Sequence, residues 1–477
     1  MKKQRLLTLL LSAIAVLLVA LVGYGHYLGE ETRALRAGHG LPPAAEPFVR
    51  IQETLQAESI PAQDRENGPG PAAPDEATRE LVDNVKAAEA ILTRADTMFR
   101  ENTAWNEVYD DLFSRPQSTW SAADWERLSD VLVENSDVLA EVYALANGNG
   151  PLYPLDFSQG YHLPLPHLST VRSMARLLQA SAISRAHSGD EAGAAADLLA
   201  GVRLSSRLEE EPLIISQLVR VAIDAIMYQG VIESFPPGEI PPELLAQLSA
   251  HHEARDLPGA LTAMWQMEGN MGVEFMSGIM NGGWQSGQAQ LREFFPHSQF
   301  PGGDWAATIY ASPFARPWQH LDMIAFGQAM DAFEPTLAQP FYEARPVIEE
   351  IQGYIDSLPR TRAVTHGLVP AMMAIHRSMA RAQTYQYLLS LGAAVESYAN
   401  ENGTYPANLG DLQGDTSIID PHTGAPFQYR TDGDTFQLYS VGPDLTDDGG
   451  EHDVIDGDIV WRGTRKSTGT TGLVATR

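Results

Sequence analysis

The sequence predicts a mainly α protein, in which a membrane-anchored helical domain is followed by a small α+β domain with one long helix and a three-stranded antiparallel sheet. Three observations lead to this fold class: an apolar run at residues 6–24, apolar residues at three- and four-residue spacing along most of the chain, and short apolar strands near the C-terminus. The expected segments are an anchor at 1–29, a flexible tether at 30–78, a helical domain at 79–375, the α+β domain at 376–463 and a disordered tail at 464–477.

The composition restricts the classes of partner and of chemistry. The chain has 477 residues and a formal net charge of −29, which argues against nucleic acid as a partner because phosphate binding needs a basic surface. It has no cysteine, which rules out disulfides, thiolate metal sites and cysteine nucleophiles. An exported protein of this composition must draw its stability from core packing and from any metal it binds.

The N-terminal segment has the features of a membrane anchor. Lys2, Lys3 and Arg5 precede the apolar run at 6–24, which as a helix would span roughly 28 Å, about the hydrocarbon thickness of a bilayer. A cleaved signal peptide is the alternative, but its apolar core is usually shorter and ends at an A-x-A-like site, which GYGHYLGEE does not offer. The basic residues place the N-terminus in the cytoplasm and the bulk of the chain outside it.

The next segments alternate between linker and helix. Residues 30–78 are rich in Pro, Gly, Ala and charge, which is typical of a tether, with a short helix as an option near 48–57. Helical spacing begins at about Thr78, and Ser121 is a candidate N-cap for the helix that follows it. Residues 168–235 predict two helices joined at Ser188-Gly189-Asp190 and a third, apolar almost all round, which we expect to be buried.

Residues 258–333 leave two interpretations open. Methionines recur along a helix-like stretch that ends near Met280, and a region rich in Gly and aromatic residues follows at 281–318. We expect a helical core with its covering loop; the alternative is a flexible apolar binding surface, for which methionine and aromatic side chains are suited. An enzyme site in this region would need convergent carboxylates such as Glu293 or Asp304.

The last hundred residues predict the α+β domain. A long helix is expected from about Val369 to Ala399, with Gly403 at the position where a left-handed residue ends a helix. Asp432-Gly433 separates two strand-like runs and is a hairpin turn signal, and the DIVW run ending at Trp461 supplies a third strand.

An acidic loop joins the second and third expected strands. Between Asp444 and Asp458 the sequence carries seven carboxylates and neither Lys nor Arg. Such a cluster repels itself unless water and salt screen it or a cation binds within it, and hard cations such as Ca²⁺ require several oxygen ligands at once. A solvated acidic turn is the alternative interpretation. An EF-hand is not expected, because Ile455 stands where the bidentate Glu would be.

Three ordered motifs carry a resemblance. They are ENGTYP after the long helix, DPHTGAPFQY before the hairpin, and YSVGPDLTDDGG closing on DGDIVW. Residues 378–462 therefore resemble the C-terminal domain of the type II secretion major pseudopilin, which implies a pilin-like α+β fold. The resemblance also implies a Ca²⁺ site at Asp444 and Asp458; spacing adds Asp448 and Asp456 as ligands. The helical remainder is similar to uncharacterised exported bacterial proteins, a kinship that brings no function with it.

These observations favour a non-enzymatic scaffold or interaction protein. We expect a single-pass protein of the bacterial inner membrane, held by its N-terminal helix, with its bulk in the periplasm, a structural Ca²⁺ and unknown envelope proteins as partners, in type II secretion or pilus-like machinery. No catalytic residue is expected, because nucleophile-elbow, phosphate-loop and zinc-protease motifs are missing from the sequence. The alternatives are an envelope hydrolase or carbohydrate-active enzyme with its site at 281–318, and a peptide-binding helical repeat protein.

Overall fold

The computed structural model describes residue 32 and residues 42–59, 74–235, 239–253, 255, 257–295, 303–412, 418–451 and 457–464. The expected anchor at 1–29 and the tail beyond residue 464 lie outside the described residues. The described α-helices are α2 (Glu46–Ser59), α4 (Glu76–Glu101), α5 (Thr103–Leu112), α6 (Ala122–Glu134), α7 (Ser136–Ala146), α8 (Pro166–His187), α9 (Glu191–Ser206), α10 (Ile214–Ser234), α11 (Pro242–Glu253), α12 (Leu257–Asn281), α13 (Trp284–Phe294), α14 (Gly303–Tyr310), α15 (Arg316–Phe333), α16 (Phe341–Ser357) and α17 (Ala363–Asn402).

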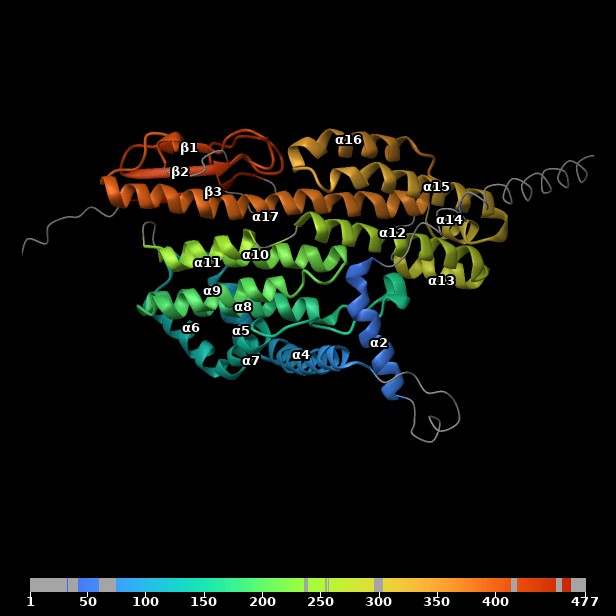
Figure 1. The fold of residues 1–477 in the computed structure, drawn as a ribbon, viewed down its shortest axis with the longest axis horizontal. Coiled ribbons are helices and arrows are strands. Elements are labelled where there is room, and N and C mark those ends of the chain that lie inside the picture. Colours follow the sequence, from blue (N-terminus) through green and yellow to red (C-terminus); the bar gives the residue numbers. More distant parts are fainter. Residues whose placement is uncertain are drawn as a thin grey trace, which may run out of the picture.

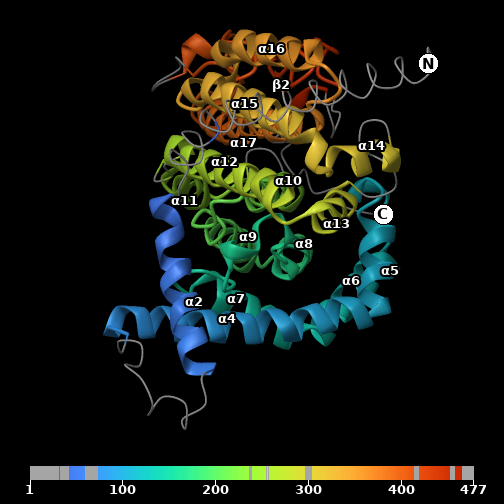
Figure 2. The same ribbon diagram turned by 90° about the vertical axis from the view of Figure 1, so that its right-hand side faces the viewer.

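The helices are stacked in layers beneath and around α17 (Figures 1 and 2). The small sheet and the pair α15 and α16 lie on one side of α17, and α10, α11 and α12 lie on the other. The hairpin α8 and α9 forms the next layer, and α4 to α7 close the opposite face. The fold is therefore mainly helical with a small sheet at one end, as the sequence predicts.

Local sequence signals set several of these helix ends. Ser121 caps α6 in a reciprocal capping box with Asp124, and Asp190 caps α9 by accepting a hydrogen bond from the Gly193 backbone N–H. Gly189 has a φ of 84°, which lets the chain turn sharply between α8 and α9. The predicted N-cap at Ser121 and the predicted turn between two helices at Ser188-Gly189-Asp190 are both confirmed.

Helix α10 occupies the centre of the helical body. It packs on α8, α9 and α17, which explains why its sequence is apolar almost all round. Among the described helices it is the one long and apolar enough to cross a membrane by length and composition. Its position between other helices accounts for that composition as core packing.

Helix α2 lies inside the segment that we expected to be a tether. Phe48 and Ile51 are fully buried, with Phe48 edge-on to Phe157 at 5.5 Å between ring centroids and Ile51 in a cluster with Val82 and Val85. At about 25 cal/mol per Å² of apolar surface, two buried side chains of this size stabilise the docked position by a few kcal/mol. This part of the segment is an element of the folded body and not a free linker.

The region from Trp284 to Trp318, expected as a covering loop, is largely helical where it is described. Helices α13 and α14 and the 3₁₀ turn η5 (Pro313–Ala315) fill it, and Leu291, Ala307 and Tyr310 point into the core. Apolar residues at three- or four-residue spacing are present in this short, Gly-rich sequence. Its many aromatic residues also occupy positions outside that spacing, so the helical pattern was not recognised. The methionine-rich stretch before it forms α12, with Met264, Met267 and Met276 buried as predicted for a core.

Helix α17 and three strands form the C-terminal unit. The sheet has the order β1 (Gln428–Thr431), β2 (Thr435–Ser440), β3 (Ile459–Thr464), with both pairs antiparallel. The β1–β2 hairpin turns at Asp432-Gly433, and Gly433 has a φ of 94°. Gly403 ends α17 in the left-handed conformation, with a φ of 76°. The three predicted strands, the hairpin and the helix stop are confirmed.

The expected domain boundary at 376 falls inside α17, which runs without a break from Ala363 to Asn402. Its first half packs on α12, α15 and α16, and its second half packs on α10, α11, β2 and β3. One hydrophobic cluster contains Leu198 and Met227 of the helical body together with Leu438 and Trp461 of the sheet. The two expected domains thus share one helix and one core.

Candidate functional site

The acidic loop leaves β2 at Val441 and returns to the sheet at β3; residues 452–456 lie outside the described part. Its described backbone is tightly turned. Gly442, Gly449 and Gly450 have positive φ angles, and Leu445 (φ 63°) is the one non-glycine described residue that does. A loop with this many left-handed positions is shaped by its glycines and held at both ends by the β2–β3 ladder.

The predicted ligands occupy different environments. Asp458 is fully buried, and its Oδ2 accepts a hydrogen bond from the Gly450 backbone N–H at 2.6 Å. Burial raises the pKa of Asp458 above its ordinary value. Asp444 and Asp448 are exposed, and Asp444 Oδ1 accepts from the Thr446 backbone N–H at 2.9 Å. The fourth predicted ligand, Asp456, lies outside the described residues.

The structure brings a different carboxylate into the local network. Asp447, which was not chosen from spacing, accepts hydrogen bonds from Tyr439 Oη at 3.0 Å and from the Gly449 backbone N–H at 2.9 Å. These two bonds lower the pKa of Asp447. Within the described residues no group of three or more His, Asp or Glu side chains converges as a metal-ligand set. Carboxylate oxygens are the ligands that a hard cation prefers, but the structure does not bring Asp444, Asp448 and Asp458 together as a coordination shell.

Two arginines from the flanking strands reach the acidic loop. Arg430 of β1 lies over the Tyr439 ring and donates from Nη2 to Tyr439 Oη at 2.7 Å, next to Asp447. Arg462 of β3 donates to the Gly450 carbonyl, which also accepts from Gln437 Nε2. The loop contains no cation of its own, yet the sheet supplies two at its base. This partial neutralisation depends on strand pairing, so a count of charged residues within the loop sequence does not include it.

A buried charge network between α9, α10 and α11 was missed by the sequence analysis. Arg255 Nη1 lies 2.8 Å from Asp224 Oδ2, and Arg255 Nε lies 2.7 Å from Glu209 Oε1. Arg220 is almost fully buried and pairs with the same two carboxylates at 3.8 and 3.4 Å. Burial by itself would raise the pKa of Asp224, but the two guanidinium groups lower it. Ser205 Oγ completes the shell of Asp224 at 2.6 Å.

Two adjacent histidines border this network. His251 Nε2 lies 2.6 Å from Ser206 Oγ and 3.2 Å from Arg255 Nη2. Burial and the Arg255 charge lower the pKa of His251 and of His252 to about 4. Both imidazoles are therefore neutral near pH 7 and are weak bases there, so the Ser206–His251 contact is poorly suited to general-base catalysis. The arrangement can fix α11 against α9 and α10.

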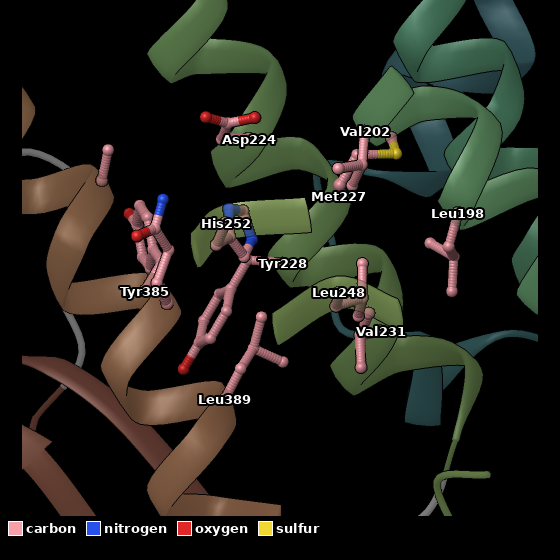
Figure 3. Close-up of a pocket in the computed structure, with 12 residues that line it drawn as sticks. Leu198, Val202, Asp224, Met227, Tyr228, Val231, Leu248, His252, Tyr385 and Leu389 are labelled. Atoms are coloured by element: carbon pink, nitrogen blue, oxygen red, sulfur yellow. The ribbon is translucent and has the colours of Figure 1, made fainter. Parts of the chain in front are cut away.

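The cavity next to this network is too small for a ligand. Leu198, Tyr228, His252 and Tyr385 line it, and their side chains close around it from α9, α10, α11 and α17 (Figure 3). Its volume of about 10 Å³ matches a single water molecule. The site is a packed junction between the helical body and α17, not a binding pocket.

A larger cleft of about 530 Å³ lies where α2 and α12 meet the 3₁₀ helix η3 (Phe157–His162). Its polar rim includes three carboxylates and three amides, so the cleft suits a ligand that presents hydrogen-bond donors or positive charge. These groups are Glu53, Asp156, Glu274, Gln52, Gln56 and Asn270. Three of these six polar groups belong to α2, the helix inside the expected tether, which is why the sequence did not indicate a cleft here.

The carboxylates expected for an enzyme site at 281–318 are both exposed. Glu293 pairs with His162 Nδ1 at 3.1 Å, and Asp304 occupies the first turn of α14, where an acidic side chain stabilises a helix N-terminus. The structure assigns each of them a local role.

Comparisons with known proteins found no match: no family model, no curated protein and no solved structure matches the chain.

Proposed function

We propose that the protein is a membrane-anchored scaffold of the bacterial cell envelope, single-pass in the inner membrane, whose periplasmic body presents a pseudopilin-like C-terminal unit to envelope partners. A role in type II secretion or in pilus-like machinery follows from the resemblance of residues 378–462. The alternative of an envelope enzyme with its site at 281–318 is not favoured by its two expected carboxylates, because Glu293 pairs with His162 and Asp304 lies in the first turn of α14.

The continuity of α17 is the observation that supports a scaffold most directly. The helix contributes to the core of the helical body through Val364 and Ile375 and to the sheet contact through Leu388 and Val395. A sheet seated on such a helix cannot reorient without breaking a shared core. Force or binding at the sheet is therefore transmitted to the helical body, which is the property that a rigid adaptor requires.

The proposal includes a structural Ca²⁺ at the acidic loop, held by Asp444, Asp448, Asp456 and Asp458. Asp458 supports it best, because a buried carboxylate with a raised pKa gains most from a nearby cation. The role of the ion would be to fix the exposed half of the loop against the β2–β3 ladder. Its effect on function would then be indirect, through the shape of the presented sheet.

Topology is the first test. The full chain, expressed in a Gram-negative host, should stay in the membrane pellet after carbonate extraction, and a variant without residues 1–29 should be released. Protease added to spheroplasts should degrade the body of the full chain. A body protected in spheroplasts, or a full chain released by carbonate, would contradict the proposal.

Partner engagement is the second test. The cysteine-free sequence permits single-cysteine crosslinking at the exposed sheet position Gln428. Val133→Cys in α6 is the control, because α6 belongs to the helical layer on the face opposite the sheet (Figure 1). Crosslinks to a defined secretion or pilus component from Gln428→Cys, and not from the control, are expected. Equal yields at both positions would count against a specific scaffold surface.

A further inference from the structure

The exposed aromatic side chains of the described residues are concentrated in one region. Eight large hydrophobic side chains are exposed in the described part of the chain, and five of them fall between residues 284 and 318. Isolated exposed apolar residues are normal, whereas a concentration of this kind marks an interaction surface. We call these five residues the aromatic patch: Trp284, Trp305, Ile309, Phe314 and Trp318.

Contacts between consecutive elements hold the patch together. Trp284 Nε1 donates to the Thr308 carbonyl at 2.9 Å, which places α13 beside α14. Trp305 and Ile309 are four residues apart on α14 and therefore share one face of that helix. The turn η5 follows α14 directly and packs on both α14 and α15, so Phe314 and Trp318 continue the same region.

The chain enters the folded body beside the aromatic patch. Thr32 is buried, and its Oγ1 lies 3.0 Å from His320 Nδ1, two residues after Trp318 on α15. Seven residues separate Thr32 from Tyr24, the last residue of the apolar run at 6–24. A fully extended chain covers at most about 3.6 Å per residue, so the end of the run lies within roughly 30 Å of His320.

We propose that the aromatic patch rests in the interfacial layer of the bilayer that holds the N-terminal segment. Trp and Phe have the chemistry for this layer, since their rings are apolar and the indole N–H can face water or lipid headgroups. The net charge of −29 gives no electrostatic attraction to an anionic surface, so insertion of aromatic rings is the available source of affinity. This inference rests on the proposed membrane anchor.

The geometry orients the body relative to the membrane. The patch lies at the α13–α15 end of the molecule, and the C-terminal sheet lies at the opposite end of α17 (Figure 1). With the patch at the lipid surface, the sheet is directed away from the membrane, because it packs on the far half of α17, a helix about 60 Å long at 1.5 Å per residue over its 40 residues. A membrane-seated patch thus explains how a scaffold with a short connection could present its far end to the periplasm.

A labelling experiment on the full chain tests the inference. Phe314→Cys and Val133→Cys are matched, because the two native side chains are 70% and 69% exposed and the chain has no other cysteine. Each variant is labelled with an environment-sensitive fluorophore and reconstituted in phosphatidylcholine nanodiscs, with or without brominated acyl chains. The Phe314 label should be quenched several-fold more by brominated lipid than the Val133 label, and less by aqueous iodide. Trp305→Cys on α14 should behave as Phe314→Cys does.

The outcomes separate this inference from the anchor. A full chain that fails to co-purify with nanodiscs overturns both. A chain that co-purifies while its Phe314 and Trp305 labels remain as accessible to iodide as the Val133 label overturns the patch and leaves the anchor. Labels at 314 and 305 that are shielded in detergent without lipid, in a particle of twice the mass, would assign the patch to a second copy and also overturn the proposal.

Discussion

The backbone of α17 at Gly392 lies directly against the indole ring of Trp461: a Cβ atom at position 392 would fall 2.7 Å from the ring atom Cδ2. Trp461 is buried at the centre of β3, and its ring also meets the Tyr228 ring edge-on at 6.1 Å between centroids. Tyr228 in turn packs on Tyr385 of α17. The glycine therefore sets the distance between helix and sheet, and the indole links both to α10.

Replacing this glycine should separate the sheet from the helix. Gly392→Ala forces the Trp461 ring or β3 to move, and overpacking of a buried contact costs about 1–3 kcal/mol of unfolding free energy. Chemical denaturation followed by Trp fluorescence measures the loss. Gly353→Ala in α16 is the control, because no atom lies within 4 Å of a Cβ built there. That variant should be neutral or more stable by up to about 1 kcal/mol, since Ala favours a helix over Gly. Equal effects of the two substitutions would refute the close-contact account.

The buried arginines predict a larger effect from one carboxylate. Asp224→Asn leaves Arg220 and Arg255 with Glu209 as their remaining partner in the network. Breaking a buried ion network by removing one charge costs about 3–5 kcal/mol, because the other charges stay buried without compensation. A drop of that size in unfolding free energy is expected from urea titration.

Glu141→Gln is the matched surface control for Asp224→Asn. It breaks the ion pair between Arg94 and Glu141, which are 2.7 Å apart and partly exposed. Exposed pairs contribute about 0–1 kcal/mol. A loss from Asp224→Asn no greater than that from Glu141→Gln would show that the network does not behave as a dry, buried cluster.

Metal binding at the acidic loop is tested by the melting temperature of the detergent-solubilised full chain. At a Ca²⁺ concentration of 100 times the dissociation constant, one site adds about 2.7 kcal/mol to the unfolding free energy. The melting temperature should rise with millimolar Ca²⁺ and fall with chelator. Asp458→Asn should abolish the response, while Asp130→Asn, an exposed position on α6, should retain it.

Arg430 offers a competing explanation of how the carboxylates of the acidic loop are neutralised. If the arginines at its base suffice, Ca²⁺ will leave the melting temperature unchanged and Arg430→Ala will lower it, because the contact with Tyr439 beside Asp447 is lost. That pair of results would replace the metal with a protein cation.

Signals carried by a few neighbouring residues were sufficient for much of the fold. Asp432-Gly433 predicts the hairpin, Gly403 the end of α17 and Ser121 the start of α6, because turn and cap chemistry act over two to four residues. The sheet order follows, since one hairpin and one further strand leave few arrangements.

Features that depend on distant segments were not predictable in this way. Arg430 and Arg462 approach the acidic loop through strand pairing, and α2 docks through two buried residues in a segment whose composition resembles a linker. The Arg220–Asp224–Arg255 network also joins separate helices. Charge counted along the sequence predicts repulsion in the loop, whereas charge counted in space includes the cations at its base. The acidic segment was therefore predicted correctly as a loop between two strands. Its surroundings were not anticipated, and its metal ligands stay a prediction.

Glu268 predicts a specific dependence of stability on pH. Its carboxyl is buried in α12, where Oε1 accepts a hydrogen bond from the Ile214 backbone N–H at 3.0 Å, and burial raises its pKa from 4.5 to about 7. Between pH 4.5 and 7 the folded state therefore holds a proton that the unfolded state has released. The stability contributed by the protonated form is complete below pH 4.5 and is lost as the pH rises to 7, by about 1.4 kcal/mol per unit of pKa difference, or about 3 kcal/mol in total.

Glu268→Gln isolates this contribution from other titrating groups. The amide keeps an oxygen acceptor for Ile214 and does not ionise, so the variant should gain stability relative to the native chain as the pH rises from 5 to 8. Exposed Glu274, six residues further along α12, supplies the matched control as Glu274→Gln, whose stability should follow the native profile. Urea titrations at half-unit pH intervals give the difference curves. Parallel profiles for the native chain and Glu268→Gln would mean that the carboxyl is ionised within the fold, and that water or a cation reaches the contact between α10 and α12.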